Sequence, residues 1–269
     1  QYRYNSIRPQ LHNILTPIVK KIILISVGVF ILQFVAQIFT KGIDPVSSIL
    51  AINPAWIKKG AVWQFITYIF THGSFIHLFF NMFVLFMFGM ELERLWGKHE
   101  FLKYYLLTGG IAGLCSFILM PAVTVGASGA IYGLLIAYGM TFPNRLIYIY
   151  FLIPIKAKYL AILFGIIELL PALQGLIRGY SGNIAHFAHL GGLAAGFVYL
   201  KLKNRNERNR QFKQRVVELD DFINKKHTND DIDPILDKIM KNGIDSLTKE
   251  EKKRLIDAGH YFRHFNHRI

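Results

Sequence analysis

The sequence predicts an all-α polytopic membrane protein, with six transmembrane helices in a bundle and a small helical cytoplasmic extension at the C-terminus. Three observations predict this class. Of the 269 residues, 52% are hydrophobic, only 18% are charged, and apolar runs recur throughout the first two hundred positions. We expect a cytoplasmic N-terminal segment over 1–17, the membrane domain over 18–203 and a polar cytoplasmic extension over 204–269.

Six apolar runs are candidates for membrane spans. A helix exposed to lipid needs about 20 apolar residues, and several runs are shorter, so we expect some helices to be sheltered inside the bundle. The third run stops at Pro121 and the fourth ends before Pro143, as expected where proline cannot continue a helix. The runs cover about 18–39, 75–90, 101–120, 127–142, 159–176 and 184–202.

Two connections between these runs are apolar. Residues 40–74 form a long loop that contains Trp56 and Trp63, and we expect it to lie in the membrane interface. Residues 146–155 are apolar but too few to cross a bilayer, and their two tyrosines suggest a second interfacial segment.

The formal net charge of +14 raises the possibility of a nucleic-acid partner, but its distribution does not favour one. Residues 1–200 hold fourteen Lys and Arg, mostly beside the apolar runs, where such residues set membrane orientation. The other seventeen lie in residues 201–269, nearly all of them in the polar extension, beside twelve acidic residues, as in a solvated tail next to a membrane. We therefore expect membrane lipid and no nucleic acid as partners, and the excess of Lys and Arg places both termini in the cytoplasm.

The extension is expected to hold two short helices and no chemistry. Residues 232–240 are amphipathic and end at Gly243, a plausible helix stop. Thr248 and Glu251 form a capping box ahead of a second helix over 252–258.

Ser128 begins the fourth apolar run, in the sequence Gly126-Ala127-Ser128-Gly129. A serine hydroxyl is a weak nucleophile until a base accepts its proton. The N–H groups of a helix's first turn have no intrahelical acceptor, so the N–H of Ser128 can stabilise an oxyanion formed by attack of its own Oγ. The alternative is that the serine and glycines are small residues for helix contact.

His189 is the candidate base. Gly192 and Gly196 follow it at spacings of three and four, so all three lie on one face of the sixth run. The glycines let this face approach another helix closely, with the histidine projecting into the contact. The alternative is a histidine that only donates a hydrogen bond for packing.

The fourth run offers a matching surface, because Gly129 and Gly133 are also four residues apart. Close packing of the two faces would bring Ser128 Oγ within hydrogen-bonding distance of the imidazole. Tyr132, one turn beyond Ser128, is placed to stack on the histidine ring.

Further polar residues lie in or beside the apolar runs. His77 and Asn81 share one helix face and can both donate hydrogen bonds, which suits an oxyanion hole as well as it suits interhelical packing. His186 is a competing base, but no carboxylate or cysteine completes a metal site with it, so no metal is expected. Glu168 has no obvious place in a triad and is expected to be structural, as is His72.

Together these residues resemble the rhomboid family of intramembrane serine proteases. The resemblance covers about 18–202 and rests on four motifs in order. They are Thr71-His72 through His77-Leu78-Phe79-Phe80-Asn81, Glu93-Arg94-Leu95-Trp96-Gly97, Gly126-Ala127-Ser128-Gly129 with Tyr132, and Ala188-His189-Leu190-Gly191-Gly192 with Gly196.

The resemblance implies a bacterial serine endopeptidase of the inner membrane, acting on transmembrane protein substrates through a Ser128–His189 dyad without a cofactor. His77, Asn81 and the Ser128 N–H would form the oxyanion hole, and Gly126 would leave room for the scissile carbonyl. The segment 173–183 would cap the site, and the helix beside it would be the substrate gate.

One position departs from the family pattern, because Gln64 stands where members often carry an arginine after Trp63. The loss of a guanidinium removes a multi-donor anchor from the long first loop, so its placement is in question.

Two other functions compete with the protease. A catalytically silent rhomboid-like protein would bind membrane clients without cleaving them, although such proteins usually lose the serine or the histidine. A small-solute transporter would be expected to show repeat symmetry and broken helices.

Overall fold

The structure, a computed structural model, describes residues 15–119, 122–149, 152–178, 186–227 and 233–254. The chain divides into two compact units, residues 1–202 and 203–269, and each is described by itself. The first unit is an all-helical polytopic membrane fold. Among the described residues, four helices are long and apolar enough to cross a membrane, over 17–39, 75–96, 98–119 and 157–175.

The first span is α1 (Pro17–Phe39), and its N-terminus is fixed by a carboxylate from another helix. Pro17 is at the start, where a missing N–H costs nothing. The N–H groups of Ile18 and Val19 donate to Glu93 Oε1 and Oε2, both at 2.9 Å. Glu93 therefore caps α1 from α6 (Met90–Trp96), satisfying first-turn donors that lack intrahelical partners.

The long first loop contains four short elements, α2 (Pro45–Leu50), α3 (Pro54–Ile57), α4 (Gln64–Thr67) and the 3₁₀ turn η1 (Tyr68–Phe70). Gln64 is fully buried beneath it. Its Oε1 accepts from Asn53 N at 2.9 Å and its Nε2 donates to Ile49 O at 3.1 Å. The amide thus anchors the loop through both ends, although it is shorter than the arginine that the family often carries.

The second span is one continuous rod made of α5 (Phe75–Val84), a π-helical turn η2 (Leu85–Gly89) and α6. It extends six residues beyond the predicted end and stops at Gly97, whose φ of +80° suits glycine. The π-helical turn adds a residue to one turn of the helix, and such bulges are frequent next to functional sites. Ser74 caps the N-terminus by accepting from His77 N at 3.2 Å.

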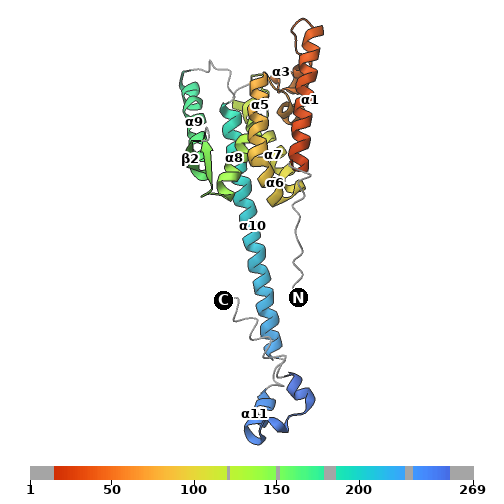
Figure 1. Cartoon of the computed structure of the whole chain (residues 1–269), viewed down its shortest axis with the longest axis vertical. Helices are drawn as coiled ribbons and strands as arrows, with labels where there is room; N and C mark the ends of the chain where they lie inside the picture. The colour runs from red at the N-terminus through yellow and green to blue at the C-terminus, as the bar shows by residue number, and fades with distance from the viewer. Residues whose placement is uncertain (1–14, 120–121, 150–151, 179–185, 228–232, 255–269) are drawn as a thin grey trace. The chain divides into compact units, whose positions relative to one another are not determined.

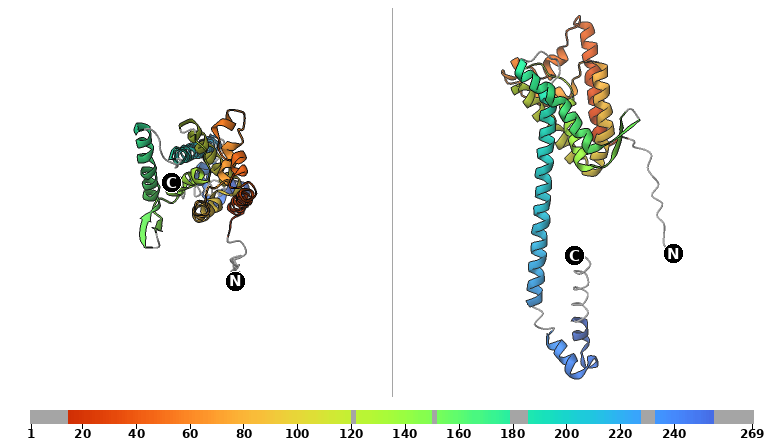
Figure 2. Two further views of the ribbon diagram at one scale, coloured as in Figure 1. Left: turned by 90° about the horizontal axis from the view of Figure 1, so that it is seen from above. Right: turned by 90° about the vertical axis from the view of Figure 1, so that its left-hand side faces the viewer.

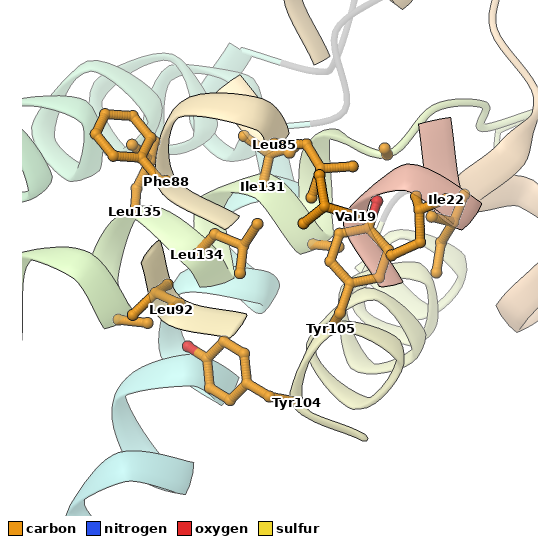
Figure 3. Close-up of a cluster of buried hydrophobic side chains, with 14 of the residues drawn as sticks. Val19, Ile22, Leu85, Phe88, Leu92, Tyr104, Tyr105, Ile131, Leu134 and Leu135 are labelled. Carbon is orange, nitrogen blue, oxygen red and sulfur yellow. The ribbon is translucent and has the colours of Figure 1, made fainter. Parts of the chain in front are cut away.

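Two helices lie at the centre of this unit, α7 (Lys98–Leu119) and α8 (Ser128–Thr141). Most residues of α8 are buried, so its 14 residues are sheltered by protein and need not match the bilayer thickness. Figure 3 shows the core that they share with α1 and the second span. Its labelled side chains include Val19, Leu85, Leu92, Tyr104 and Leu134.

The apolar segment after α8 is a β-hairpin, which the sequence did not predict. β1 (Leu146–Ile149) pairs antiparallel with β2 (Ile153–Lys156). Pairing satisfies the backbone groups of a run too short to cross the bilayer as a helix. The hairpin leads into α9 (Ala157–Arg178), which stands at the edge of the unit (Figures 1 and 2) and contacts α8.

The sixth apolar run forms the start of α10 (His186–His227), whose remaining residues belong to the second unit. That unit also contains α11 (Asp233–Asn242) and the 3₁₀ turn η4 (Ile244–Ser246). Gly243 follows α11 with a φ of +78°, and its N–H donates to Ile239 O at 2.9 Å. The predicted helix stop is confirmed.

The capping box in the second unit is also confirmed. Thr248 N donates to Glu251 Oε2 at 2.7 Å, and Glu251 N donates to Thr248 Oγ1 at 3.2 Å. Of the helix predicted over 252–258, residues 255–258 lie outside the described part of the chain.

Candidate active site

Ser128 is the first residue of α8, immediately after a sharp turn of the backbone. Gly126 has a φ of +108°, a conformation that L side chains rarely adopt, and its N–H donates to Tyr68 O at 3.0 Å. This turn points the start of α8 toward α5 and α10. The first-turn N–H groups of α8, including that of Ser128, have no acceptor within the helix.

His189 meets this serine from α10. Its Nε2 lies 2.7 Å from Ser128 Oγ, within hydrogen-bonding distance, although 61 residues separate the two in sequence. The contact links the first turn of α8 to the first turn of α10. A hydroxyl and an imidazole so placed can exchange a proton directly.

Close approach of α10 to α8 makes the contact possible. A Cβ atom on Gly192 would lie 1.9 Å from Gly129 O, and one on Gly196 would lie 2.3 Å from Tyr104 Oη and 3.2 Å from Gly133 O. No side chain fits at either position. The sequence therefore predicted correctly that these two glycines lie where another helix passes.

The matching surface on α8 differs from the prediction. A Cβ atom on Gly129 would meet Ala112 Cβ at 2.4 Å, and one on Gly133 would meet Thr108 Oγ1 at 2.7 Å, both on α7. The missing side chains of these glycines thus allow α7 to approach, while their carbonyl oxygens face α10. The four-residue spacing matched on both helices, but it did not reveal which neighbour each glycine faces.

Tyr132 lies on the His189 ring. The ring centroids are 4.4 Å apart and the planes differ by 15°, so the two rings are stacked as the sequence suggested. Its hydroxyl donates a hydrogen bond to Glu168 Oε1. The ring of Tyr132 therefore packs on one face of the imidazole, while its hydroxyl binds the carboxylate of Glu168 from α9.

The sequence analysis found no place for Glu168 near the reacting residues, but the structure places it beside His189. Its Oε2 lies 3.0 Å from His189 Nδ1, close enough for an ion pair, but off the direction in which Nδ1 would donate a hydrogen bond. The same oxygen lies 2.6 Å from His186 Nδ1. An ionisable group in an apolar helix was the available signal, because such residues are costly in a membrane and usually functional.

His186 and His189 therefore do have a carboxylate beside them, contrary to the expectation. One ring nitrogen of each histidine and a Glu168 oxygen all lie within 4.8 Å of one another, and two histidines with one glutamate are a set that can bind zinc. In the structure these atoms pair with one another, and Tyr132 occupies the second carboxylate oxygen.

His77 and Asn81 line the α5 side of the site. A Cβ atom on Gly126 would lie 2.5 Å from His77 Cε1 and 2.7 Å from His77 Nε2, so the glycine leaves room for this ring. Asn81 is buried, and its Nδ2 makes no hydrogen bond within the described part of the chain. A buried amide donor without an acceptor is available to a ligand oxygen.

His72 lies beside His77, with the ring centroids 5.2 Å apart, and its structural role stays a prediction. Its backbone N–H donates to Gln33 Oε1 at 3.2 Å, and Gln33 Nε2 donates to His72 O at 3.3 Å. Burial and the neighbouring His77 ring lower the pKa of His72 to about 4, so the side chain is uncharged at neutral pH. The predicted cap over 173–183 lies partly outside the described residues, which end at 178 and resume at 186.

Comparison with known proteins points to one family. The Rhomboid domain family matches residues 59–205, more than half of the chain, and a family of unknown function (DUF6576) matches residues 219–257.

Three similar proteins illustrate the match. The putative rhomboid protease YdcA of Bacillus subtilis is 37% identical over 146 residues, which are 53% of this chain and 67% of that protein. Rhomboid-like protein 11, chloroplastic, of Arabidopsis thaliana is 33% identical over 195 residues, 68% of this chain and 64% of that protein. Rhomboid protease GluP of Bacillus subtilis is 34% identical over 143 residues, 52% of this chain and 26% of that protein. The chain thus spans between about a quarter and two thirds of these relatives.

Proposed function

Because this chain belongs to the rhomboid family, we propose that it is an intramembrane serine endopeptidase that cleaves transmembrane proteins near the membrane boundary. Ser128 would be the nucleophile and His189 the general base. The observation that carries the proposal is the 2.7 Å distance between Ser128 Oγ and His189 Nε2. The imidazole ring of His189 is stacked on Tyr132. The family's name alone would not assign a role to either residue.

The first half of the reaction forms an acyl-enzyme. As Ser128 Oγ attacks the scissile carbonyl carbon, its proton passes to His189 Nε2, and negative charge develops on the carbonyl oxygen. The C–N bond then breaks as His189 returns this proton to the leaving amine. In the second half, water attacks the ester, again giving its proton to His189, and Ser128 leaves as the free hydroxyl.

Three donors are available for the oxyanion. The N–H of Ser128 lies in the first turn of α8, Asn81 Nδ2 has no partner in the part of the chain that the structure describes, and His77 lies beside Gly126. Donors fixed before the reaction stabilise a developing charge without having to reorganise. Gly126 would serve two purposes, because it gives room to the His77 ring and to the scissile carbonyl next to Ser128.

Substrates are proposed to be membrane helices that unwind easily. A carbonyl within an α-helix is already hydrogen-bonded, so it must be released before Ser128 can attack it. Glycine, proline or polar residues near the boundary make that release easier. A site next to several glycines would favour small side chains at the cleaved bond.

We also propose that both termini are cytoplasmic, in a bacterial inner membrane. Arg145, Lys156 and Lys158 flank the hairpin at the end of α8, and positive charge favours the cytoplasmic side. Ser128, at the other end of α8, would then lie in the non-cytoplasmic half of the membrane, where water reaches it from that side.

The proposal is tested with the full-length chain reconstituted in liposomes with a transmembrane substrate that carries glycine and proline near its boundary. We expect a discrete cleavage product from the wild type and none from Ser128→Ala or His189→Ala. Ser48→Ala is the matched control, since Ser48 lies in the first loop, exposed to solvent, and should leave cleavage unchanged. A substrate that binds the wild type without being cleaved would instead indicate the silent client-binding protein.

A further inference from the structure

We propose that Glu168 is a positioning residue for His189, so that Ser128, His189 and Glu168 form a relay in which the carboxylate orients the imidazole and stabilises its protonated form. This inference rests on the proposed peptidase function and deepens it. It gives Glu168, a residue of α9 that was expected to be structural, a role in the reaction.

The carboxylate of Glu168 is directed at the base from a separate helix. The residue is 6% exposed, near the middle of an apolar helix, and its Oε2 lies 3.0 Å from His189 Nδ1. Ser128 lies at the other nitrogen of the same ring, 2.7 Å from Nε2. The three groups are therefore arranged in series across α9, α10 and α8.

Two further contacts fix where the carboxylate lies. Tyr132 donates to Oε1 through its hydroxyl while its ring stacks on His189, and His186 Nδ1 lies 2.6 Å from Oε2. Both oxygens are thus held, and the plane of the imidazole is held as well. A carboxylate restrained in this way keeps its charge at one place relative to Nδ1.

The titratable groups around His189 come from four helices. Glu168 lies on α9, Tyr132 on α8, and His186 on α10 itself. His77 lies on α5 and interacts electrostatically with His189. Glu168 is the one acid of this set. The other residues of the set are hydrogen-bond donors or imidazoles. A positive charge on His189 is therefore stabilised by the negative charge of Glu168.

This charge arises during the reaction. When Ser128 attacks, its proton moves to Nε2 and His189 becomes a cation next to Glu168, so the attraction is greater in the transition state than in the resting protein. Interactions that strengthen in the transition state raise kcat. Before attack, the negative charge beside Nδ1 favours the tautomer with hydrogen on Nδ1 and a free lone pair on Nε2, which is the tautomer a base for Ser128 requires.

A purely structural glutamate would behave differently from a positioning one. If Glu168 only joined α9 to α8 and α10 by hydrogen bonds, glutamine would serve nearly as well, because its carbonyl accepts from the Tyr132 hydroxyl. A neutral amide cannot compensate an imidazolium, and its NH₂ group turned toward Nδ1 would favour the wrong tautomer.

The test compares Glu168→Gln, Glu168→Asp and the wild type in proteoliposomes with the same transmembrane substrate. For Glu168→Gln we expect kcat to fall about 100-fold or more with KM changed by less than about threefold, by analogy with loss of the carboxylate in serine-protease triads. Glu168→Asp keeps the charge on a side chain shorter by one methylene, and we expect it to restore part of kcat. Glu91→Gln is the matched control, a carboxylate of α6 that pairs with Arg145 and Tyr138 away from the site.

Two substitutions separate charge compensation from packing. Glutamine keeps the size of Glu168 and removes its charge, whereas aspartate keeps the charge and shortens the side chain. Charge compensation therefore predicts the larger loss of kcat in Glu168→Gln, and packing predicts it in Glu168→Asp. Should Glu168→Gln fail to fold, Glu168→Asp and Tyr132→Phe, which removes only the hydroxyl, carry the same comparison.

Two results distinguish this inference from the peptidase proposal. A Glu168→Gln variant with kcat within about twofold of wild type would overturn the role of Glu168 while leaving the Ser128–His189 pair intact. A wild type that cleaves no substrate would overturn both.

Discussion

Gly192 lies directly against the backbone of Gly129, so that a Cβ atom at position 192 would be 1.9 Å from the carbonyl oxygen of residue 129. This is the contact that brings α10 up to the first turn of α8. The carbonyl is part of the α8 hydrogen-bond ladder and cannot rotate away. The distance between the hydroxyl of Ser128 and the imidazole of His189 depends on this approach.

Gly192→Ala should therefore separate the two helices. We expect cleavage to be lost and the free energy of unfolding to fall by about 1–3 kcal/mol, as for other overpacked cores. Gly165→Ala is the control, because a Cβ there would make an ordinary contact with Leu193 Cδ1 at 3.5 Å. Stability is measured by denaturant unfolding in detergent, and full activity of Gly192→Ala would show that the close approach is not needed.

Asn81→Leu should affect the chemical step with little effect on substrate binding. The buried Nδ2 of Asn81 has no hydrogen-bond partner among the described residues, and we predict that it donates to the oxyanion. Loss of one such donor lowers kcat by about 10²–10³. Steady-state kinetics in proteoliposomes gives kcat and KM separately, and a change in KM alone would assign Asn81 to binding or packing.

Glu93→Ala should weaken the fold and leave the reacting groups in place. The variant leaves the N–H groups of Ile18 and Val19 without their acceptor at the buried start of α1. We expect a loss of about 1–3 kcal/mol in the free energy of unfolding. At a temperature where the variant is folded, its kcat should equal that of the wild type, and a selective loss of kcat would indicate a role in the site.

His72 should make the fold sensitive to acid. Burial and the nearby His77 lower the pKa of His72 from 6.5 to about 4, so between these values the unfolded chain binds a proton that the folded chain does not. Stability is then complete above pH 6.5 and falls by up to about 3 kcal/mol as the pH drops toward 4. Unfolding curves of wild type and His72→Gln at pH 7 and 4.5 measure this, and equal losses in both proteins would exclude His72 as the source.

Cleavage should fall on acidification for a separate reason. A protonated His189 cannot accept the proton of Ser128, so on the acid side the rate should decline by about tenfold per pH unit. The folded fraction is followed at each pH to separate this effect from acid unfolding. A profile that stays flat into strongly acidic conditions would mean that His189 is not the base.

Local patterns in this chain predicted local structure well. The six apolar runs correspond to α1, the α5–α6 rod, α7, α8, α9 and the start of α10. They were predictable because each helix is marked by its own continuous stretch of apolar residues. The capping box of Thr248 and Glu251 and the stop at Gly243 are confirmed for the same reason, since their partners are three or four residues away. The hairpin over 146–156 was missed because a short apolar run has no period that separates a strand from an interfacial segment.

Long-range contacts were predicted only where two patterns matched. The glycine spacing on two helices anticipated that Ser128 and His189 approach each other, but it did not show that Gly129 and Gly133 turn their missing side chains to α7. Glu168 lacked any partner motif in the sequence, so its place beside His189 follows only from how α9 packs on α8. The position of Gln64 could not be predicted either. Its amide makes hydrogen bonds to the backbone of Asn53 and Ile49 and so anchors the first loop, where family members often carry a longer arginine.

The most direct test of the account is mass spectrometry of the membrane-embedded chain after treatment with a fluorophosphonate that reacts with activated serines. We predict one adduct, on Ser128, which is absent from His189→Ala because the hydroxyl is activated only by that imidazole. Labelling of other serines to the same extent as Ser128, or labelling of Ser128 that persists in His189→Ala, would contradict the account.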